Sequence, residues 1–136
     1  MTVYFSHPTF TYHTETERKC ISKIRKKFSE EIVNPSEKGF RSKSKEMIDK
    51  SDKIVGVAIE DKVTFLVNQE VKYAKNSGNK AYIINVEEKN LISDIRDFSR
   101  DDFEILTLEK TKEFKANLRK EDLSVTGFLF GGKSRF

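Results

Sequence analysis

The segment at residues 53–59, with the sequence KIVGVAI, constrains the fold of this chain more than any other feature. After Lys53 the residues are apolar without a break, and most are β-branched, which favours a β-strand. A strand with one face in water alternates apolar and polar residues, whereas a strand covered on both faces does not. We therefore expect residues 53–59 to lie in the interior of a parallel sheet that helices cover on both sides.

Strand-like and helix-like patterns alternate along the rest of the chain. The other strand-like segments are residues 2–6, 31–33, 81–86 and 103–108. The helix-like segments are residues 14–28, 42–50, 63–76, 91–98 and 111–119. This alternation predicts an α/β fold with three layers, a Rossmann-like or flavodoxin-like parallel sheet of about five strands in the order 2-1-3-4-5. Residues 1–136 are expected to form one such domain, whose aperiodic tail at residues 120–136 packs on this subunit or joins it to another in a homo-oligomer.

The composition argues against several classes of protein. Lys and Arg number 26 against 22 Asp and Glu, so the net charge of +4 describes a mildly basic surface of mixed sign. No basic run is long enough for a nucleic-acid groove, and no apolar run is long enough to span a membrane. The single cysteine, Cys20, excludes a disulfide framework and a cysteine-based metal site. The N-terminus lacks the pattern of a signal peptide, so we expect a cytoplasmic protein that uses no metal and no cofactor.

The first helix-like segment carries two readable signals. Thr14 followed three residues later by Glu17 is a capping box, which marks the N-terminus of a helix. Cys20, Ile24 and Phe28 then share one apolar face at helical spacing. Cys20 is therefore predicted to fill the core and not to act as a nucleophile.

The predicted topology also places a binding cleft. In parallel sheets, ligands bind outside the carboxyl ends of the strands, at the point where the strand order reverses. For the order 2-1-3-4-5 this point lies between the first and third strands, so the loops at residues 6–13 and 60–64 are expected to border the cleft. Their candidate binding residues are Ser6, His7, Pro8, Phe10, Glu60 and Thr64. His7 and His13 share one loop without a third ligand, so we expect no metal site there.

Glu70 occupies an unusual position in the helix-like segment at residues 63–76. At about 100° per residue it falls in the middle of an apolar arc that includes Val67, Val71 and Ala74. A carboxylate at such a position is costly unless it is paired or lines a cleft. Two interpretations stay open: a structural glutamate satisfied by a Lys, a Tyr or backbone amides, and a reactive carboxylate at a pocket wall. The helix begins at one of the two cleft loops, which favours the second.

The chain resembles the nucleoside 2-deoxyribosyltransferase-like proteins, which include N-glycosidases of deoxynucleoside monophosphates. The resemblance lies in the strand and proline-bearing loop at residues 4–10, the step from residues 48–52 into the strand at residues 53–59, and the sequence EVKYA at residues 70–74. It implies that Glu70 attacks the anomeric carbon of a nucleoside or nucleotide and forms a glycosyl-enzyme intermediate.

The same resemblance implies roles for other residues. Ser6, His7, Pro8 and Phe10 would form the wall beside the base. Independently of the resemblance, an ionised Glu70 in an apolar arc needs hydrogen-bond donors, and we expect them among the hydroxyls of Tyr4, Ser6 and Tyr73 and the loop amides after the first strand. Thr64, six residues before Glu70, matches a hydroxyl residue of the monophosphate hydrolases. A hydroxyl at a helix N-terminus can contribute to a phosphate site, although a plain helix cap is the alternative. Ser44 stands where the family carries an Asp.

A second resemblance is to TIR-type domains. It rests on the sequence SDKIV at residues 51–55 and on a later helix that carries Glu70. Some TIR domains cleave NAD, and others only assemble with partners. This resemblance implies, as an alternative, a nucleotide-binding or signalling module without catalysis.

Residues 127–134, GFLFGGKS, match the phosphate-binding loop pattern of nucleoside triphosphatases. That chemistry needs a helix after the loop, because the amides of its first turn hold the phosphates. Only Arg135 and Phe136 follow. We therefore expect this match to have no role in nucleotide binding.

Overall fold

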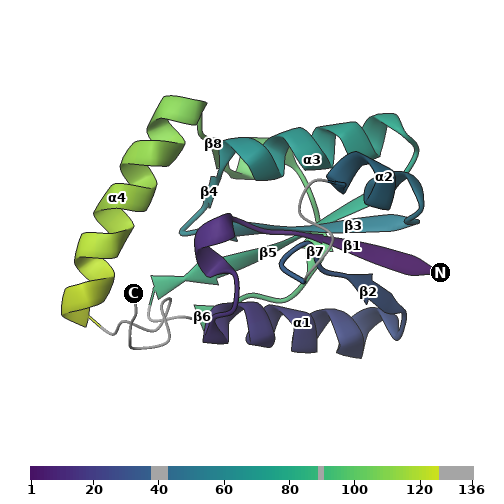
Figure 1. The fold of residues 1–136 in the computed structure, drawn as a ribbon, viewed down its shortest axis with the longest axis horizontal. Coiled ribbons are helices and arrows are strands. Elements are labelled where there is room, and N and C mark those ends of the chain that lie inside the picture. Colours follow the sequence, from purple (N-terminus) through teal and green to yellow (C-terminus); the bar gives the residue numbers. More distant parts are fainter. Residues whose placement is uncertain (38–42, 89–90, 126–136) are drawn as a thin grey trace.

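The computed structural model describes residues 1–37, 43–88 and 91–125, and it describes side chains as far as residue 118. The P-loop-like match at residues 127–134 lies outside these ranges. The described residues form an α/β fold with one mixed sheet of eight strands. Figure 1 shows α1 on one face of this sheet and α2 and α3 on the other, while α4 stands at one end.

Four parallel strands form the middle of the sheet. They are β2 (Glu31–Val33), β1 (Thr2–Ser6), β3 (Lys53–Ile59) and β5 (Lys80–Glu87), and they are neighbours in that order. The strand β3 therefore pairs on both sides, as the run KIVGVAI predicts, and residues 54–59 are all buried. This arrangement agrees with the expected order for the first four strands.

The helices cover the two faces with separate apolar clusters. On one face, α1 (Glu15–Phe28) packs Cys20 and Ile24 against Val3, Phe5 and Val55. On the other face, α2 (Ser44–Asp49) and α3 (Phe65–Asn76) contribute to a second cluster. Its helix residues are Ile48, Val67, Val71 and Ala74. Cys20 is 1% exposed, in agreement with its predicted role in the core.

The edges of the sheet differ from the expectation of a purely parallel sheet. Residues 91–98, expected to be helical, instead contain β6 (Leu91–Ile92) and β7 (Arg96–Asp97), which pair antiparallel with β5. The free edge of β5 offers unpaired amide and carbonyl groups, and these two short strands satisfy part of them. The predicted helix was therefore wrong, because pairing with the preceding strand β5 overrides the local apolar spacing.

The expected fifth strand at residues 103–108 is also wrong in length and place. Within residues 103–108 only Glu104–Ile105 forms a strand, β8, and it pairs with β4 (Lys62–Val63) instead of lying beyond the fourth parallel strand. The strand β4 turns back antiparallel from the end of β3. This hairpin takes the positions at which the helix of residues 63–76 was expected to begin, so α3 starts at Phe65.

The last helix, α4 (Leu108–Val125), is longer than the predicted segment at residues 111–119 and includes the first part of the expected tail. Two 3-10 turns lie in loops: η1 (Thr9–Thr11) follows β1, and η3 (Arg100–Asp102) precedes β8. No helix in the described part of the chain has the length and apolar character that a membrane span requires.

Candidate active site around Glu70

Glu70 faces the end of β1 and accepts hydrogen bonds from two of its side chains. The Ser6 hydroxyl donates to Oε1 of Glu70 at 2.7 Å, and the Tyr4 hydroxyl lies 3.3 Å from Oε2. Tyr4 and Ser6 are both fully buried, whereas Glu70 is only half-buried. Each carboxylate oxygen thus has one neutral donor and keeps acceptor capacity for a further partner. Neither a lysine nor a backbone amide is among these contacts.

The position of Glu70 follows from how α3 packs on the sheet. Val67, Val71 and Ala74 are buried on the face of α3 that meets β3. Gly56, which pairs with Ser6 in the sheet, lies under this helix. A Cβ atom at Gly56 would come within 3.2 Å of Val71 Cγ2 and 3.3 Å of Val67 Cγ1. The absence of a side chain at Gly56 therefore lets α3 approach closely enough for Glu70 to reach the β1 side chains.

Burial raises the pKa of Glu70 above the ordinary carboxyl value. Hydrogen bonds from Ser6, Tyr4 and Ser44 oppose this rise, because they stabilise the charged form. Ser44 is the first residue of α2, so the hydroxyl at the position where the resemblance expects an Asp does lie beside Glu70. Burial and the neighbouring Glu70 also raise the pKa of Tyr4, which keeps its hydroxyl protonated as a donor.

Tyr73, the third expected donor, does not contact Glu70. Its hydroxyl donates to Oδ1 of Asp49 at 2.8 Å, on the outer side of α2 and α3. This hydrogen bond raises the pKa of Tyr73. Tyr73 therefore links two helices, and the structure gives it no part in the Glu70 cluster.

His7 is buried at 2% exposure, unlike an open loop residue that would meet a base. Its Nε2 lies 2.8 Å from Oε2 of Glu17, and its Nδ1 lies 3.1 Å from the carbonyl oxygen of Phe5. Both ring nitrogens face acceptors, and only a doubly protonated ring donates to both. The ring also stacks on Phe5, with centroids 3.9 Å apart. His7 therefore ties the loop after β1 to α1 and presents no free nitrogen to a ligand.

Glu17 is the centre of this second cluster. Burial alone would raise its pKa, but hydrogen bonds from His7, Ser36 and the backbone of His13, together with the charge of His7, lower it to about 2. The Thr14 side chain accepts from the Glu17 amide at 3.2 Å, as the capping box predicts. In a capping box the Glu17 carboxylate would accept from the amide of the N-cap residue, Thr14. Here it accepts from the preceding amide, that of His13, at 3.1 Å.

Pro8 and Phe10 are also buried, whereas residues that form an open wall beside a base would be exposed. Pro8 is buried, and its carbonyl oxygen accepts hydrogen bonds from the Thr11 amide and hydroxyl. Phe10 is 9% exposed and packs edge-to-face against Phe114 of α4, with ring centroids 6.3 Å apart. No sequence pattern predicts this contact, because Phe114 is more than a hundred residues away from Phe10 in the chain.

Thr64 is the N-cap residue of α3, the position that the helix-cap alternative predicts for it. Its hydroxyl, however, makes no cap hydrogen bond. The side chain is 2% exposed, and within the described ranges its Oγ1 has no hydrogen-bond partner. The first amide of α3, that of Phe65, donates instead to Oγ1 of Thr111 on α4 at 3.0 Å. A residue from a distant helix thus caps α3.

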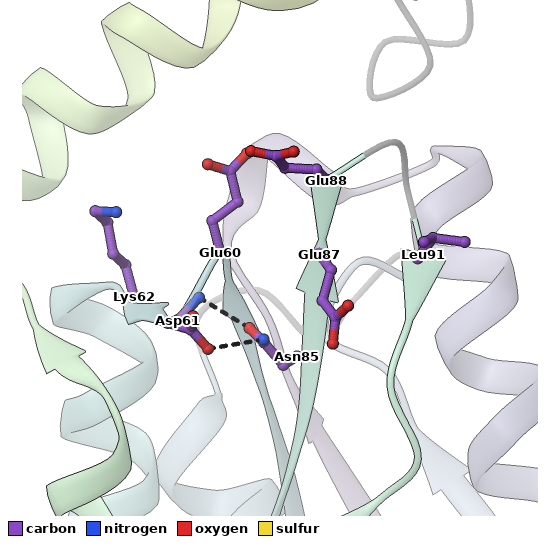
Figure 2. A pocket seen from close by; sticks show the side chains of 7 residues that line it. All are labelled: Glu60, Asp61, Lys62, Asn85, Glu87, Glu88 and Leu91. Carbon is purple, nitrogen blue, oxygen red and sulfur yellow. Dashed lines mark hydrogen bonds between the residues drawn. The ribbon is translucent and has the colours of Figure 1, made fainter.

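Glu60 lies apart from the Glu70 cluster, in a cleft of about 640 Å³ at the carboxyl ends of β3 and β5 (Figure 2). The lining residues are Glu60, Asp61, Lys62, Asn85, Glu87, Glu88 and Leu91. Four of these seven are acidic and one is basic, so this cleft disfavours a phosphate. The expectation that Glu60 shares a nucleotide site with Glu70 is not supported by this geometry.

The turn between β3 and β4 shapes that cleft. Glu60 and Asp61 both have positive φ, 49° and 65°, which is typical of a two-residue hairpin turn. Gly, Asn and Asp tolerate this backbone, so the conformation is costly for Glu60 and less so for Asp61. Asn85 holds the turn: its Oδ1 accepts from the Asp61 amide at 3.0 Å, and its Nδ2 donates to Asp61 Oδ1 at 2.9 Å (Figure 2). Asn85 was not among the predicted site residues, although a polar residue inside the apolar segment AYIINV is a signal that the sequence contains.

Among the residues that the structure describes, no group of three or more His, Cys, Asp or Glu side chains is placed to hold a metal ion. The groups that the structure places around the Glu70 carboxylate are the hydroxyls of Tyr4, Ser6 and Ser44. No protein-family model, no curated protein and no solved structure matches this chain.

Proposed function

We propose that this protein acts at the N-glycosidic bond of a nucleoside or nucleotide, as a hydrolase or a (deoxy)ribosyltransferase of Rossmann-like fold, with Glu70 as the nucleophile. The observation that carries the proposal is the half-buried Glu70 carboxylate, held at the end of β1 by the Ser6 hydroxyl at 2.7 Å and the Tyr4 hydroxyl at 3.3 Å. Neutral donors orient a carboxylate without neutralising it, which suits a nucleophile better than an ion pair would.

The reaction would run in two displacements. An oxygen of Glu70 forms a bond to the anomeric carbon while the bond from that carbon to the base nitrogen breaks, and the base leaves with the electron pair and takes a proton from water. Water then attacks the glycosyl ester, releases the sugar and returns the free carboxylate; a second base in place of water would give transfer. Ser6 and Tyr4 hold the carboxylate in place through both steps.

A second candidate is a nucleotide-binding or signalling module without catalysis. Two observations favour it: Phe10 is buried beneath Phe114, and burial raises the pKa of Glu70, which disfavours the ionised nucleophile. In this case Glu70 would serve the fold by linking α3 to β1.

Base release separates the two candidates. The protein is incubated with a panel of nucleosides, nucleoside 5′-monophosphates and NAD, and free base is measured by chromatography. The enzyme requires release that Glu70→Gln abolishes and that Glu46→Gln, a change at an exposed glutamate of α2, leaves intact. If the folded protein releases no base from any compound of the panel, the result would favour the binding or signalling module without catalysis.

A further inference from the structure

We propose that α4 is an autoinhibitory helix, which occupies the expected substrate cleft and must move away before a phosphate-bearing ligand binds at the N-terminus of α3. The inference rests on the proposed function, since it names the regulation of the same site. In Figure 1, α4 belongs to neither helical layer and stands across the end of the sheet at which β5 ends. Ligands of parallel sheets bind at that end.

Within residues 108–118, the part of α4 whose side chains the structure describes, one narrow stripe contacts the rest of the molecule. Thr111, Phe114, Lys115 and Leu118 are covered at least in part, at the spacing of one helical face. The remaining α4 residues between 108 and 117 are exposed, and most are polar or charged. Among residues 108–118 of α4 only Leu118 is buried, whereas α1 and α3 each bury at least two residues in a core cluster, so this part of α4 is held less strongly than those helices.

The contacts of this stripe fall on the groups that a nucleotide would use. Thr111 Oγ1 accepts the hydrogen bond of the Phe65 amide, the first amide of α3, which would otherwise be available to a phosphate. Beside it the buried Thr64 hydroxyl has no partner among the described residues, so the site keeps an unused polar group.

The aromatic contact covers the other half of the cleft. Phe114 packs edge-to-face on Phe10, the residue expected to meet the base, at 6.3 Å between ring centroids. The ammonium group of Lys62 lies 5.7 Å from the centre of the same Phe114 ring. Leu118 completes the docking at 5% exposure in the cluster that contains Phe10. Withdrawal of α4 would therefore free an amide, an aromatic face and a lysine at once, a set that suits an anionic aromatic ligand.

If closed α4 excludes the ligand, the apparent dissociation constant is the intrinsic one divided by the open fraction. Variants that loosen α4 should therefore bind more tightly. We would measure the affinity for deoxyadenosine and deoxycytidine 5′-monophosphate by calorimetry, in a Glu70→Gln background that prevents turnover. Thr111→Val, which removes only the acceptor oxygen, and Phe114→Ala should each tighten binding at least fivefold. Glu113→Ala, on the exposed side of α4, is the matched control and should leave affinity unchanged.

Hydrogen exchange gives the second readout. Saturating monophosphate should speed the exchange of backbone amides at residues 111–118. Unchanged or weaker affinity in both loosened variants, ligand-induced protection of α4, or no binding in any variant would each overturn the inference. If Phe114→Ala does not fold, the nearly isosteric Thr111→Val decides alone. Base release with Glu70 intact is measured separately, so an active protein whose α4 variants bind like the parent would refute the autoinhibitory helix and leave the proposed function standing.

Discussion

The Ser6 hydroxyl donates a 2.7 Å hydrogen bond to Oε1 of Glu70, across a separation of 64 residues in the sequence. Ser6 is the last residue of β1, and Glu70 lies in the middle of α3. Ser6 is fully buried while Glu70 keeps access to solvent, so the donor is fixed by the core and the acceptor is positioned by the donor.

Ser6→Ala should lower kcat/KM for base release by about 5- to 10-fold at neutral pH, the effect of one lost hydrogen bond. Wild-type activity should fall at low pH as Glu70 protonates, at a pH above the ordinary carboxyl range because burial raises the pKa of Glu70. Ser6→Ala should move this acidic limb to higher pH, since Ser6 stabilises the charged form. A limb that stays in place in pH–rate profiles of both proteins would contradict the role of Ser6.

The raised pKa of Glu70 should also affect how the free energy of unfolding depends on pH. A carboxyl group whose pKa is raised on folding favours the folded state below its ordinary pKa, and that contribution is lost as the pH rises through the raised value. Glu70→Gln cannot ionise, so its free energy of unfolding should improve relative to the wild type as the pH rises through this window. Urea denaturation across a pH series measures the difference, and a constant difference would argue against a buried ionisable Glu70.

Glu17→Gln should destabilise the fold by roughly 2–4 kcal/mol at neutral pH, because it breaks a buried pair with His7. The pKa of Glu17 is lowered from 4.5 to about 2, so its stabilising contribution is present above pH 4.5 and is lost as the pH falls toward 2. The gap between wild type and variant should close over that window. Glu15→Gln, at an exposed position of the same helix, should stay within about 0.5 kcal/mol of the wild type at every pH.

Gly56→Ala should cost about 1–3 kcal/mol, because the added methyl group would press on Val67 and Val71 of α3. Thermal denaturation measures this cost, and base release should fall with it, since α3 must shift away from Ser6. Gly78→Ala provides the comparison: nothing lies within 4 Å of its new Cβ, and its cost should come only from the positive φ of 93°. Equal activity losses in the two variants would show that the α3 approach is not what matters.

Glu60→Asn should stabilise the protein by about 0.5–1 kcal/mol, because Asn accepts the left-handed backbone that Glu60 adopts at φ 49°. Glu60→Ala lacks this preference and should give no gain. Base release should be unchanged in both variants, since Glu60 lines a cleft separate from the Glu70 cluster. A large loss of activity in either variant would contradict this separation and indicate that Glu60 contributes to the substrate site.

The sequence was sufficient for the middle of the sheet and for the orientation of Glu70. The uninterrupted apolar run at residues 53–59 reports burial on both faces, and its place between β1 and β5 follows from that pattern. The helical spacing of Val67, Val71 and Ala74 shows which side of α3 meets the sheet, and Glu70 shares that side. These features were predictable because periodicity is a local property of the chain.

The tertiary structure alone decided the sheet edges, the loop after β1 and the position of α4. Residues 91–98 pair with β5 because that edge is free, and no local pattern records which edges are free. His7 is buried because Glu17 supplies a partner from the next helix, and Phe10 is covered because Phe114 reaches it from α4. Each of these outcomes depends on a partner outside the segment itself. Local spacing can show that a residue is able to be buried, but only the assembled chain determines what buries it.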